Sequence, residues 1–148
     1  MNHWKNRATT AARLTIGLIF TVFGLNGFLH FLPQPPATGP SADFAMALAA
    51  TGYMFPLIKG TELVTGILLL ANRWVPFALT VLAPVVVNIV AFHVFLAPAG
   101  LVLPLAVVAL GVFLAWSERA AYAPLFRTHA TRATIHSDRI GSHATTSA

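Results

Sequence analysis

The stretch WVPFALTVLAPVVVNIVAFHVFLA, from Trp74 to Ala97, decides the fold because it contains no Asp, Glu, Lys or Arg. A helix needs about 20 mainly apolar residues to cross the hydrocarbon core of a bilayer. The stretch is therefore predicted to be a membrane-spanning helix. Pro84 lies inside it and leaves the carbonyl of Thr80 without its helical partner, which predicts a kink at this point.

Three other stretches share this apolar character, so four spans are predicted. They cover residues of about 14–32, 53–71, 74–97 and 101–117. Within these spans, charged residues occur only in the second, which holds Lys59 and Glu62. The predicted fold class is an all-α membrane protein, a bundle of four transmembrane helices.

The composition of the whole chain supports a lipid environment. Of its 148 residues, 57% are hydrophobic and 9% are charged, whereas soluble domains average about 25% charged residues. A soluble protein of this size could not cover its surface with so few charges. The absence of cysteine excludes disulfides, cysteine-ligated metals and thiol-disulfide catalysis by this chain.

Outside the predicted spans, basic residues occur only in the segments on one side of the membrane. They precede the first span, follow the second and follow the fourth, at Lys5, Arg7, Arg13, Arg73, Arg119, Arg127, Arg132 and Arg139. The positive-inside rule then places both termini in the cytoplasm. This topology accounts for the net charge of +5, and no nucleic-acid partner is predicted.

The chain is divided into three parts. Residues 1–12 form a cytoplasmic N-terminus, residues 13–122 form the membrane domain, and residues 123–148 form a cytoplasmic tail of low hydrophobicity that is predicted to be disordered. Between the first two spans, Ser41 is predicted to cap a short helix over residues 42–50. Two interpretations of this helix stay open: an interfacial helix on the outer membrane face, or a lid over an outward-facing pocket.

Polar residues within the predicted spans share one depth. Given the topology and a rise of about 1.5 Å per residue, all of them fall in the outer half of the bilayer. The set comprises Asn26, His30, Lys59, Glu62, Asn88 and His93. Because polar groups are costly in lipid, this layer is the predicted site of the protein.

Spacing within the layer predicts which side chains meet. Asn26 and His30 are four residues apart and are predicted to share a helix face. Lys59 and Glu62 are three apart and can neutralise each other. The second oxygen of the Glu62 carboxylate then needs a donor, and Asn26, His30 or Asn88 are the candidates.

Asn88 and His93 are less easily reconciled. Five residues on an ideal helix diverge by about 140°, so the Pro84 kink or a second partner is needed to bring both into one site. The alternative for the whole layer is packing, because polar residues between membrane helices hydrogen-bond across them, at about 0.6 kcal/mol each.

At these residues the sequence resembles the DoxX family of small four-helix membrane proteins. The resemblance rests on ARLTIGLIFTVFGLNGFLHFLPQP, on FPLIKGTELVTGILLLANRWVPFALTVLAPVVVNIVAFHVFLAP and on LAWSERAAYAPLF, and it covers roughly residues 11–126. It implies a multi-pass protein of a bacterial-type inner membrane, with the six polar residues as matching positions. Family members are associated with quinone-dependent oxidation of sulfur compounds and with membrane redox complexes.

The first functional hypothesis is a subunit or accessory of a membrane redox system with a quinone-type ligand near the outer leaflet. In this hypothesis Glu62, His30 and His93 are the catalytic candidates, since His titrates near neutral pH and Glu can carry a proton. Asn26, Lys59 and Asn88 are the ligand-binding candidates. Phe28, Phe31, Phe92 and Phe95 would supply an apolar wall. No metal ligands are predicted. A variant in which His30 and His93 ligate a haem is weighed as the weaker option.

Two further classes stay open. A non-enzymatic scaffold would use the polar layer to fix the register of its helices, and its partners would be other membrane or redox subunits or a second copy of the chain. A small transporter would use Glu62 for proton coupling, but the neighbouring Lys59 disfavours a lone titrating carboxylate.

Overall fold

The computed structural model describes residues 3–33 and 38–126, and over these ranges the chain is helical with no strand. The prediction for the tail lies, from residue 127 onward, outside the described residues. The helices are α1 (His3–Leu29), α2 (Pro40–Ala50), α3 (Met54–Leu70), α4 (Val75–Phe95), α5 (Val102–Ser117) and α6 (Arg119–Tyr122), with 3-10 turns η1 (Pro98–Gly100) and η2 (Ala123–Phe126).

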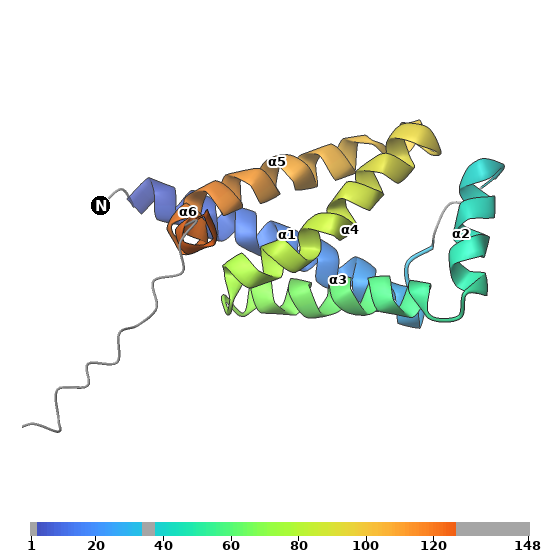
Figure 1. The fold of residues 1–148 in the computed structure, drawn as a ribbon, viewed down its shortest axis with the longest axis horizontal. Helices are drawn as coiled ribbons and strands as arrows, with labels where there is room; N and C mark the ends of the chain where they lie inside the picture. The colour runs from blue at the N-terminus through green and yellow to red at the C-terminus, as the bar shows by residue number, and fades with distance from the viewer. Residues whose placement is uncertain (1–2, 34–37, 127–148) are drawn as a thin grey trace, which may run out of the picture.

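Four long helices surround one core, and each contacts two of the others (Figure 1). α1 packs along α3, α3 contacts α4, α4 contacts α5, and α5 returns to α1. Leu69, Leu82 and Leu114 are among the buried residues at the centre. Many large apolar side chains point outward instead, which is the distribution expected of helices that contact lipid.

The number of membrane spans is settled only in part. α1 (over Trp4–Leu29) and α4 are long and apolar enough to cross a bilayer. α2 and α3 together would count as a third candidate, although the chain bends by 92° between them. α5 is apolar but shorter, at 16 residues. The structure therefore supports two or three spanning helices by length and composition, and the four-span bundle stays a prediction.

The tightest helix pair is α1 with α3, and glycines make it possible. A Cβ on Gly24 would lie 2.6 Å from the amide nitrogen of Leu63, and one on Gly66 would lie 2.6 Å from that of Thr21. These are backbone atoms, which cannot move without separating the helices. Small residues allow this close approach of helices in membranes.

The end of α3 explains the sharp turn into α4. Asn72 adopts a left-handed conformation (φ 54°), and the amide N–H of Arg73 donates to the carbonyl of Leu68 at 3.0 Å. Asn tolerates this conformation better than most residues. The guanidinium of Arg13, on α1, donates to the carbonyls of Leu69 and Leu70 and so caps the same end.

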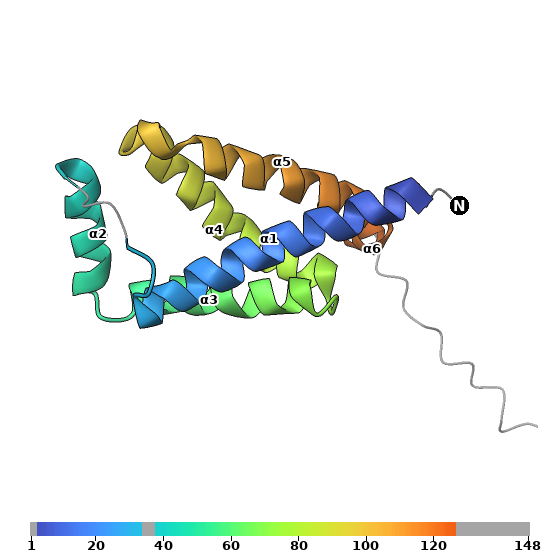
Figure 2. The same ribbon diagram turned by 180° about the vertical axis from the view of Figure 1, so that it is seen from behind.

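Different elements lie at the two ends of the molecule (Figure 2). The start of α1, the turn between α3 and α4, and α6 lie together at one end, while α2 stands across the opposite end. The C-terminal end of α1, the start of α3 and the end of α4 lie near α2. The predicted polar residues belong to these segments, so they gather toward the α2 end.

α2 begins earlier than predicted. It starts at Pro40, and Gly39 before it has a positive φ of 61°. The Ser41 hydroxyl donates to the carbonyl of Thr38 at 3.0 Å, so the prediction that Ser41 caps the helix is wrong. Proline suits the first position of a helix, so the cap position is Gly39 and Ser41 lies two residues after it.

Candidate functional site

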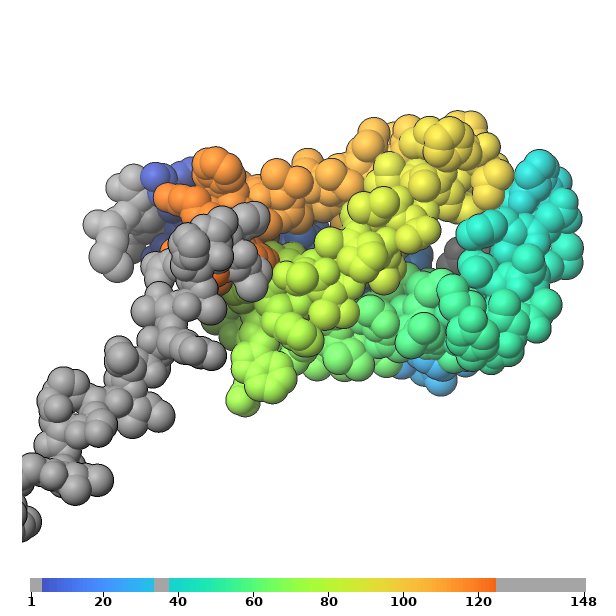
Figure 3. Space-filling model, viewed as in Figure 1, coloured from blue at the N-terminus to red at the C-terminus, as the bar shows by residue number. Residues whose placement is uncertain are grey.

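Two cavities meet at the polar layer and share Lys59, Glu62 and His93. The first, which we call the α5-side cavity, has a volume of about 380 Å³ and is also lined by Phe20, Phe23, Gly100 and Leu103. The second, the α2-side cavity, has a volume of about 400 Å³ and is also lined by Phe44, Leu48, Phe55 and Asn88. The space-filling view in Figure 3 shows α2 at this end of the helix bundle.

Lys59 and Glu62 form an ion pair, as their spacing predicts. Lys59 Nζ donates to Glu62 Oε2 at 2.8 Å. The Glu62 side chain is 3% exposed, whereas that of Lys59 is 21% exposed. The carboxylate is therefore buried, while the Lys59 side chain is partly exposed and its ammonium has donors left for a second partner.

The path of the Lys59 side chain depends on α1. A Cβ on Gly27 would collide with the Cγ and Cδ atoms of Lys59, so the aliphatic stem crosses the α1 backbone where no side chain stands. The ammonium also lies 5.8 Å from the ring centroid of Phe55, within the range of a cation–π contact. Gly27 and Phe55 thus fix the position of the charged group.

His93 lines both cavities, and one of its ring nitrogens is hydrogen-bonded to its own helix. Its Nδ1 lies 2.8 Å from the carbonyl oxygen of Ile89, and because a carbonyl only accepts, Nδ1 must carry the proton. In the neutral ring Nε2 is then an acceptor. The ring stands edge-on to Phe92 at 5.2 Å between centroids. The missing side chain of Gly100 leaves room for it, since a Cβ there would lie 2.8 Å from the His93 Cδ2.

Asn26 is buried but lines neither cavity. Its Oδ1 accepts the backbone N–H of Leu32 at 2.6 Å, so the amide ties the end of α1 to the segment that follows. Asn88 lines the α2-side cavity, and its Nδ2 donates to the carbonyl of Pro84, on its own helix, at 2.8 Å. Asn88 and His93 do reach one cavity, as the site prediction requires.

His30 lies away from both cavities. It follows α1 directly, in a left-handed conformation (φ 51°), and is exposed. The prediction that His30 shares a helix face with Asn26 is wrong, because the helix ends at Leu29. The structure therefore does not bring His30 to the cavities that His93 lines, as a haem held between the two histidines would require.

Among the described residues, none of the three candidate donors hydrogen-bonds to the Glu62 carboxylate, and Lys59 alone does so. Of the predicted aromatic wall, Phe92 lines both cavities, while Phe28, Phe31 and Phe95 are exposed. Sequence reasoning missed Phe44, whose ring lies 5.7 Å from that of Phe92. The sequence marked Gly27 as a small residue that lets a neighbouring helix approach, but it gave no signal for Gly100, because the role of Gly100 depends on a neighbour distant in the chain.

Within residues 3–33 and 38–126, no group of three or more His, Cys, Asp or Glu side chains is placed to hold a metal ion. Comparison of the chain with known protein families, with curated proteins and with solved structures finds no match in any of the three.

Proposed function

We propose that this chain is a DoxX-like, four-span protein of a bacterial-type inner membrane, and that it acts as a subunit or accessory of a quinone-linked redox system. The observation that carries the proposal is the Lys59–Glu62 pair, with its carboxylate buried, which lines two largely apolar cavities together with His93. Ionisable residues among membrane helices are costly and typically mark functional sites.

Support for four spans comes from the lengths of α3 and α5. At 1.5 Å per residue, their 17 and 16 residues extend about 26 and 24 Å, a few Å short of a hydrocarbon core of about 30 Å. Local thinning of the bilayer accommodates such a mismatch at modest cost. In this topology, α2 lies at the outer interface and the basic end faces the cytoplasm.

The side chains at the junction fit a quinone-type ligand. A quinone carbonyl needs a donor, and Lys59 has N–H groups beyond the one given to Glu62. A quinol hydroxyl needs an acceptor, and His93 Nε2 is an acceptor in the neutral ring. Phe20, Phe23 and Phe92 offer apolar surface for the ring. When bound, a quinone would supply the reversible two-electron chemistry.

The chain's own residues hold and move protons in this proposal. His93 accepts a proton at Nε2 while its Nδ1–H stays on the Ile89 carbonyl, which keeps the ring in one orientation. Glu62, fixed through Oε2 by Lys59, receives or releases a proton at Oε1. The proposal uses Asn88 as a polar lining group of the α2-side cavity and does not use His30.

Mild purification from the native membrane, followed by quinone extraction and identification of the proteins that copurify, tests this function. We expect bound quinone in the wild type and a clear loss in Glu62→Gln. Asp43→Asn, the same chemical change on an exposed residue of α2, should behave as the wild type. A wild type without quinone, together with unchanged partner activity in Glu62→Gln, would count against the proposal.

A scaffold for other membrane subunits, or for a second copy of this chain, is the alternative that specific observations favour. The amide groups of Asn26 and Asn88 bond to nearby backbone groups, and the α1–α3 interface is closely packed. A scaffold would keep its function when Lys59→Met and Glu62→Gln are combined, whereas a proton-handling site would lose it.

A further inference from the structure

The end of the molecule opposite α2 gathers tryptophan and basic side chains, and we call it the basic end. The chain has three Trp residues, and all of them lie here: Trp4 at the start of α1, Trp74 just before α4 and Trp116 at the end of α5. They are 78%, 69% and 70% exposed. Exposed cations at this end are Lys5, Arg7, Arg73 and Arg119, and among the described residues Glu118 is its one carboxylate.

Tryptophan and basic residues together are typical of the level of the lipid headgroups. The indole ring is amphipathic, and the cations attract anionic lipids within about a Debye length of the surface. Arg119 also lies 5.8 Å from the ring centroid of Trp116, within the range of a cation–π contact. The basic end is therefore suited to an anionic lipid surface.

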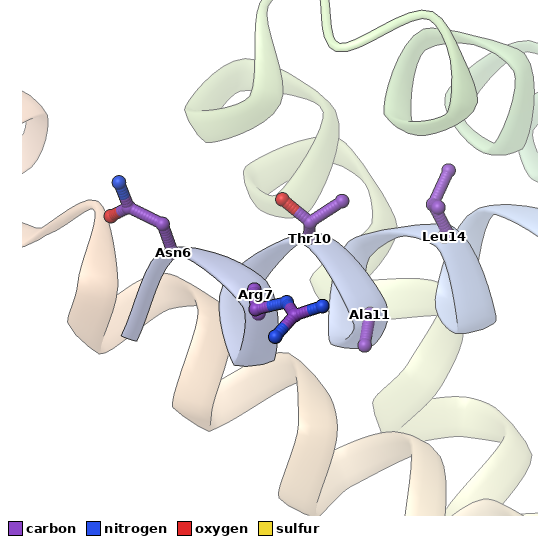
Figure 4. Close-up of a pocket in the computed structure, with 5 residues that line it drawn as sticks. All are labelled: Asn6, Arg7, Thr10, Ala11 and Leu14. Atoms are coloured by element: carbon purple, nitrogen blue, oxygen red, sulfur yellow. The ribbon is translucent and has the colours of Figure 1, made fainter. Parts of the chain in front are cut away.

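The basic end contains a shallow groove on α1. It is lined by Asn6, Arg7, Thr10, Ala11 and Leu14 (Figure 4). The first three side chains offer N–H or O–H donors, and the last two, further along the helix, are apolar. Figure 4 shows the Arg7 guanidinium extended along α1 toward Ala11. The order from donors to apolar residues matches a phospholipid, with its phosphate outside and its acyl chains inside.

Arg13, the next arginine along α1, differs from Arg7 because its guanidinium is bonded within the protein. Arg13 donates to the carbonyls at the end of α3, so its guanidinium is engaged within the protein. Asn6, Arg7 and Thr10 are exposed, and their side chains form no hydrogen bond with another described residue. Their donors are therefore free, within the described structure, for an external acceptor.

We propose that this groove binds the headgroup of an anionic phospholipid. The Arg7 guanidinium, a planar fork of donors suited to phosphate, pairs with the phosphate, while Asn6 and Thr10 supply further hydrogen bonds. An acyl chain then lies along Ala11 and Leu14. The proposal requires only that the apolar helices contact a bilayer, and it is independent of the redox function proposed above.

The tryptophans provide a reporter for the test. Full-length protein carrying Trp74→Phe and Trp116→Phe, which leaves Trp4 beside the groove, is placed in phosphatidylcholine vesicles that contain brominated phosphatidylglycerol or brominated phosphatidylcholine. We expect stronger quenching of Trp4 by the brominated phosphatidylglycerol. Arg7→Gln should reduce this preference about tenfold, the change expected for loss of one hydrogen bond to a charged group. Circular dichroism establishes that each variant is folded.

Lys5→Gln is the matched control, because Lys5 is an exposed cation on the same turns that does not line the groove. It should change the preference much less than Arg7→Gln does. Equal losses in the two variants would mean a diffuse basic surface and would overturn the groove. Equal quenching of Trp4 by the two lipids would show that the groove does not prefer the anionic lipid, and would overturn the proposal. Relief of quenching by inorganic phosphate, but not by chloride of equal ionic strength, would identify free phosphate as the ligand instead.

Discussion

The Glu62 side chain is buried, whereas that of its partner Lys59 is partly exposed, and this difference decides what each contributes to stability. Without Lys59 the Glu62 carboxylate has no donor among the described hydrogen bonds, because the Asn26 side chain is bonded only as an acceptor, through Oδ1, and Asn88 Nδ2 donates to the Pro84 carbonyl. An unpaired ammonium on a long flexible stem can turn toward the surface. Loss of the two partners is therefore expected to have unequal effects on the stability of the fold.

Removal of the cation is therefore predicted to cost more than removal of the anion. Lys59→Met should destabilise the fold by about 3 kcal/mol, the cost of breaking a buried pair. Glu62→Gln, which keeps the shape of the side chain and leaves a mobile cation, should cost about 1 kcal/mol. Unfolding of the protein in detergent micelles with increasing denaturant measures both. Equal costs in the two variants would contradict this account.

At this scale the sequence predicted the ion pair but not its surroundings. The spacing of Lys59 and Glu62 was sufficient, because both lie within one regular helix. The position of His30 was not predictable in the same way, since it depends on α1 ending at Leu29. The orientation of His93 follows from a carbonyl one turn earlier and from the absence of a side chain at Gly100, which only the folded structure brings beside it.

Among the elements, α1 and α3 form the closest pair, and their contact runs through backbone atoms. Gly24 faces the backbone of Leu63, whereas Gly60, on α3, has nothing within 4 Å of where its Cβ would lie. Both glycines are inside helices. The two glycines therefore have the same helix propensity to lose or gain and differ only in the space around their Cβ positions.

An alanine at these two positions should have opposite effects. Gly24→Ala is predicted to destabilise the fold by about 2 kcal/mol, because α3 must move away to make room. Gly60→Ala should instead stabilise it by about 0.5–1 kcal/mol, the gain for replacing a helical glycine where space allows. The same detergent unfolding experiment compares them. A stabilised Gly24→Ala variant would show that the two helices are less closely packed.

A second contact between elements joins α6 to the start of α4. The Tyr122 hydroxyl donates to the carbonyl of Pro76 at 2.9 Å. Burial raises the pKa of the Tyr122 phenol, the Glu118 carboxylate acts in the same direction, and the Thr80 hydroxyl opposes them. The neutral phenol is thus the form that the folded state favours.

Tyr122→Phe should accordingly cost about 1 kcal/mol at neutral pH, the value of one hydrogen bond. Because the folded-state pKa is raised, the contribution of the phenol is complete below the ordinary tyrosine value of about 10 and is lost as the pH rises through the folded-state pKa. Stability measured against pH should therefore fall less steeply in the alkaline range for Tyr122→Phe than for the wild type. Parallel curves would contradict the raised pKa.

For the elements, the sequence predicted the helical stretches and most of their bounds. The bounds of α3, α4 and α5 differ from the predicted spans by one or two residues, since prolines and charges punctuate these segments. α1 was less well predicted, because it begins at His3, within a segment without the apolar character that marks a span. The pairing of α1 with α3 could not be ranked above other pairings, because glycines also occur on α5.

The whole molecule has one polar end near α2 and one basic end, and both described ends of the chain are at the basic end. The alternation of basic residues predicted this distribution without a structure. The two cavities were not predictable, because each is enclosed by residues from at least three helices and its volume depends on how they pack. The number of spans depends on the bilayer as well as on the chain, as the length of α5 shows.

The proposed topology predicts the outcome of reporter fusions. Alkaline phosphatase, which is active only outside the cytoplasm, should be active when fused after Gly52 and inactive when fused after Ser117. A fluorescent protein that folds in the cytoplasm should be bright when fused to the C-terminus. An active phosphatase at both positions would contradict a cytoplasmic location for the basic end.

The glycine contacts between α1 and α3 have a consequence for biosynthesis. α1 is synthesised first, and its closest partner, α3, follows only after α2. The α1 face with Gly17, Gly24 and Gly27 is therefore without its partner helix until α3 has been synthesised. Helices that are independently stable in lipid can wait in this way before they associate. We expect the α1–α3 pair to assemble as soon as residue 70 has left the insertion machinery, with α4 and α5 docking onto an established pair.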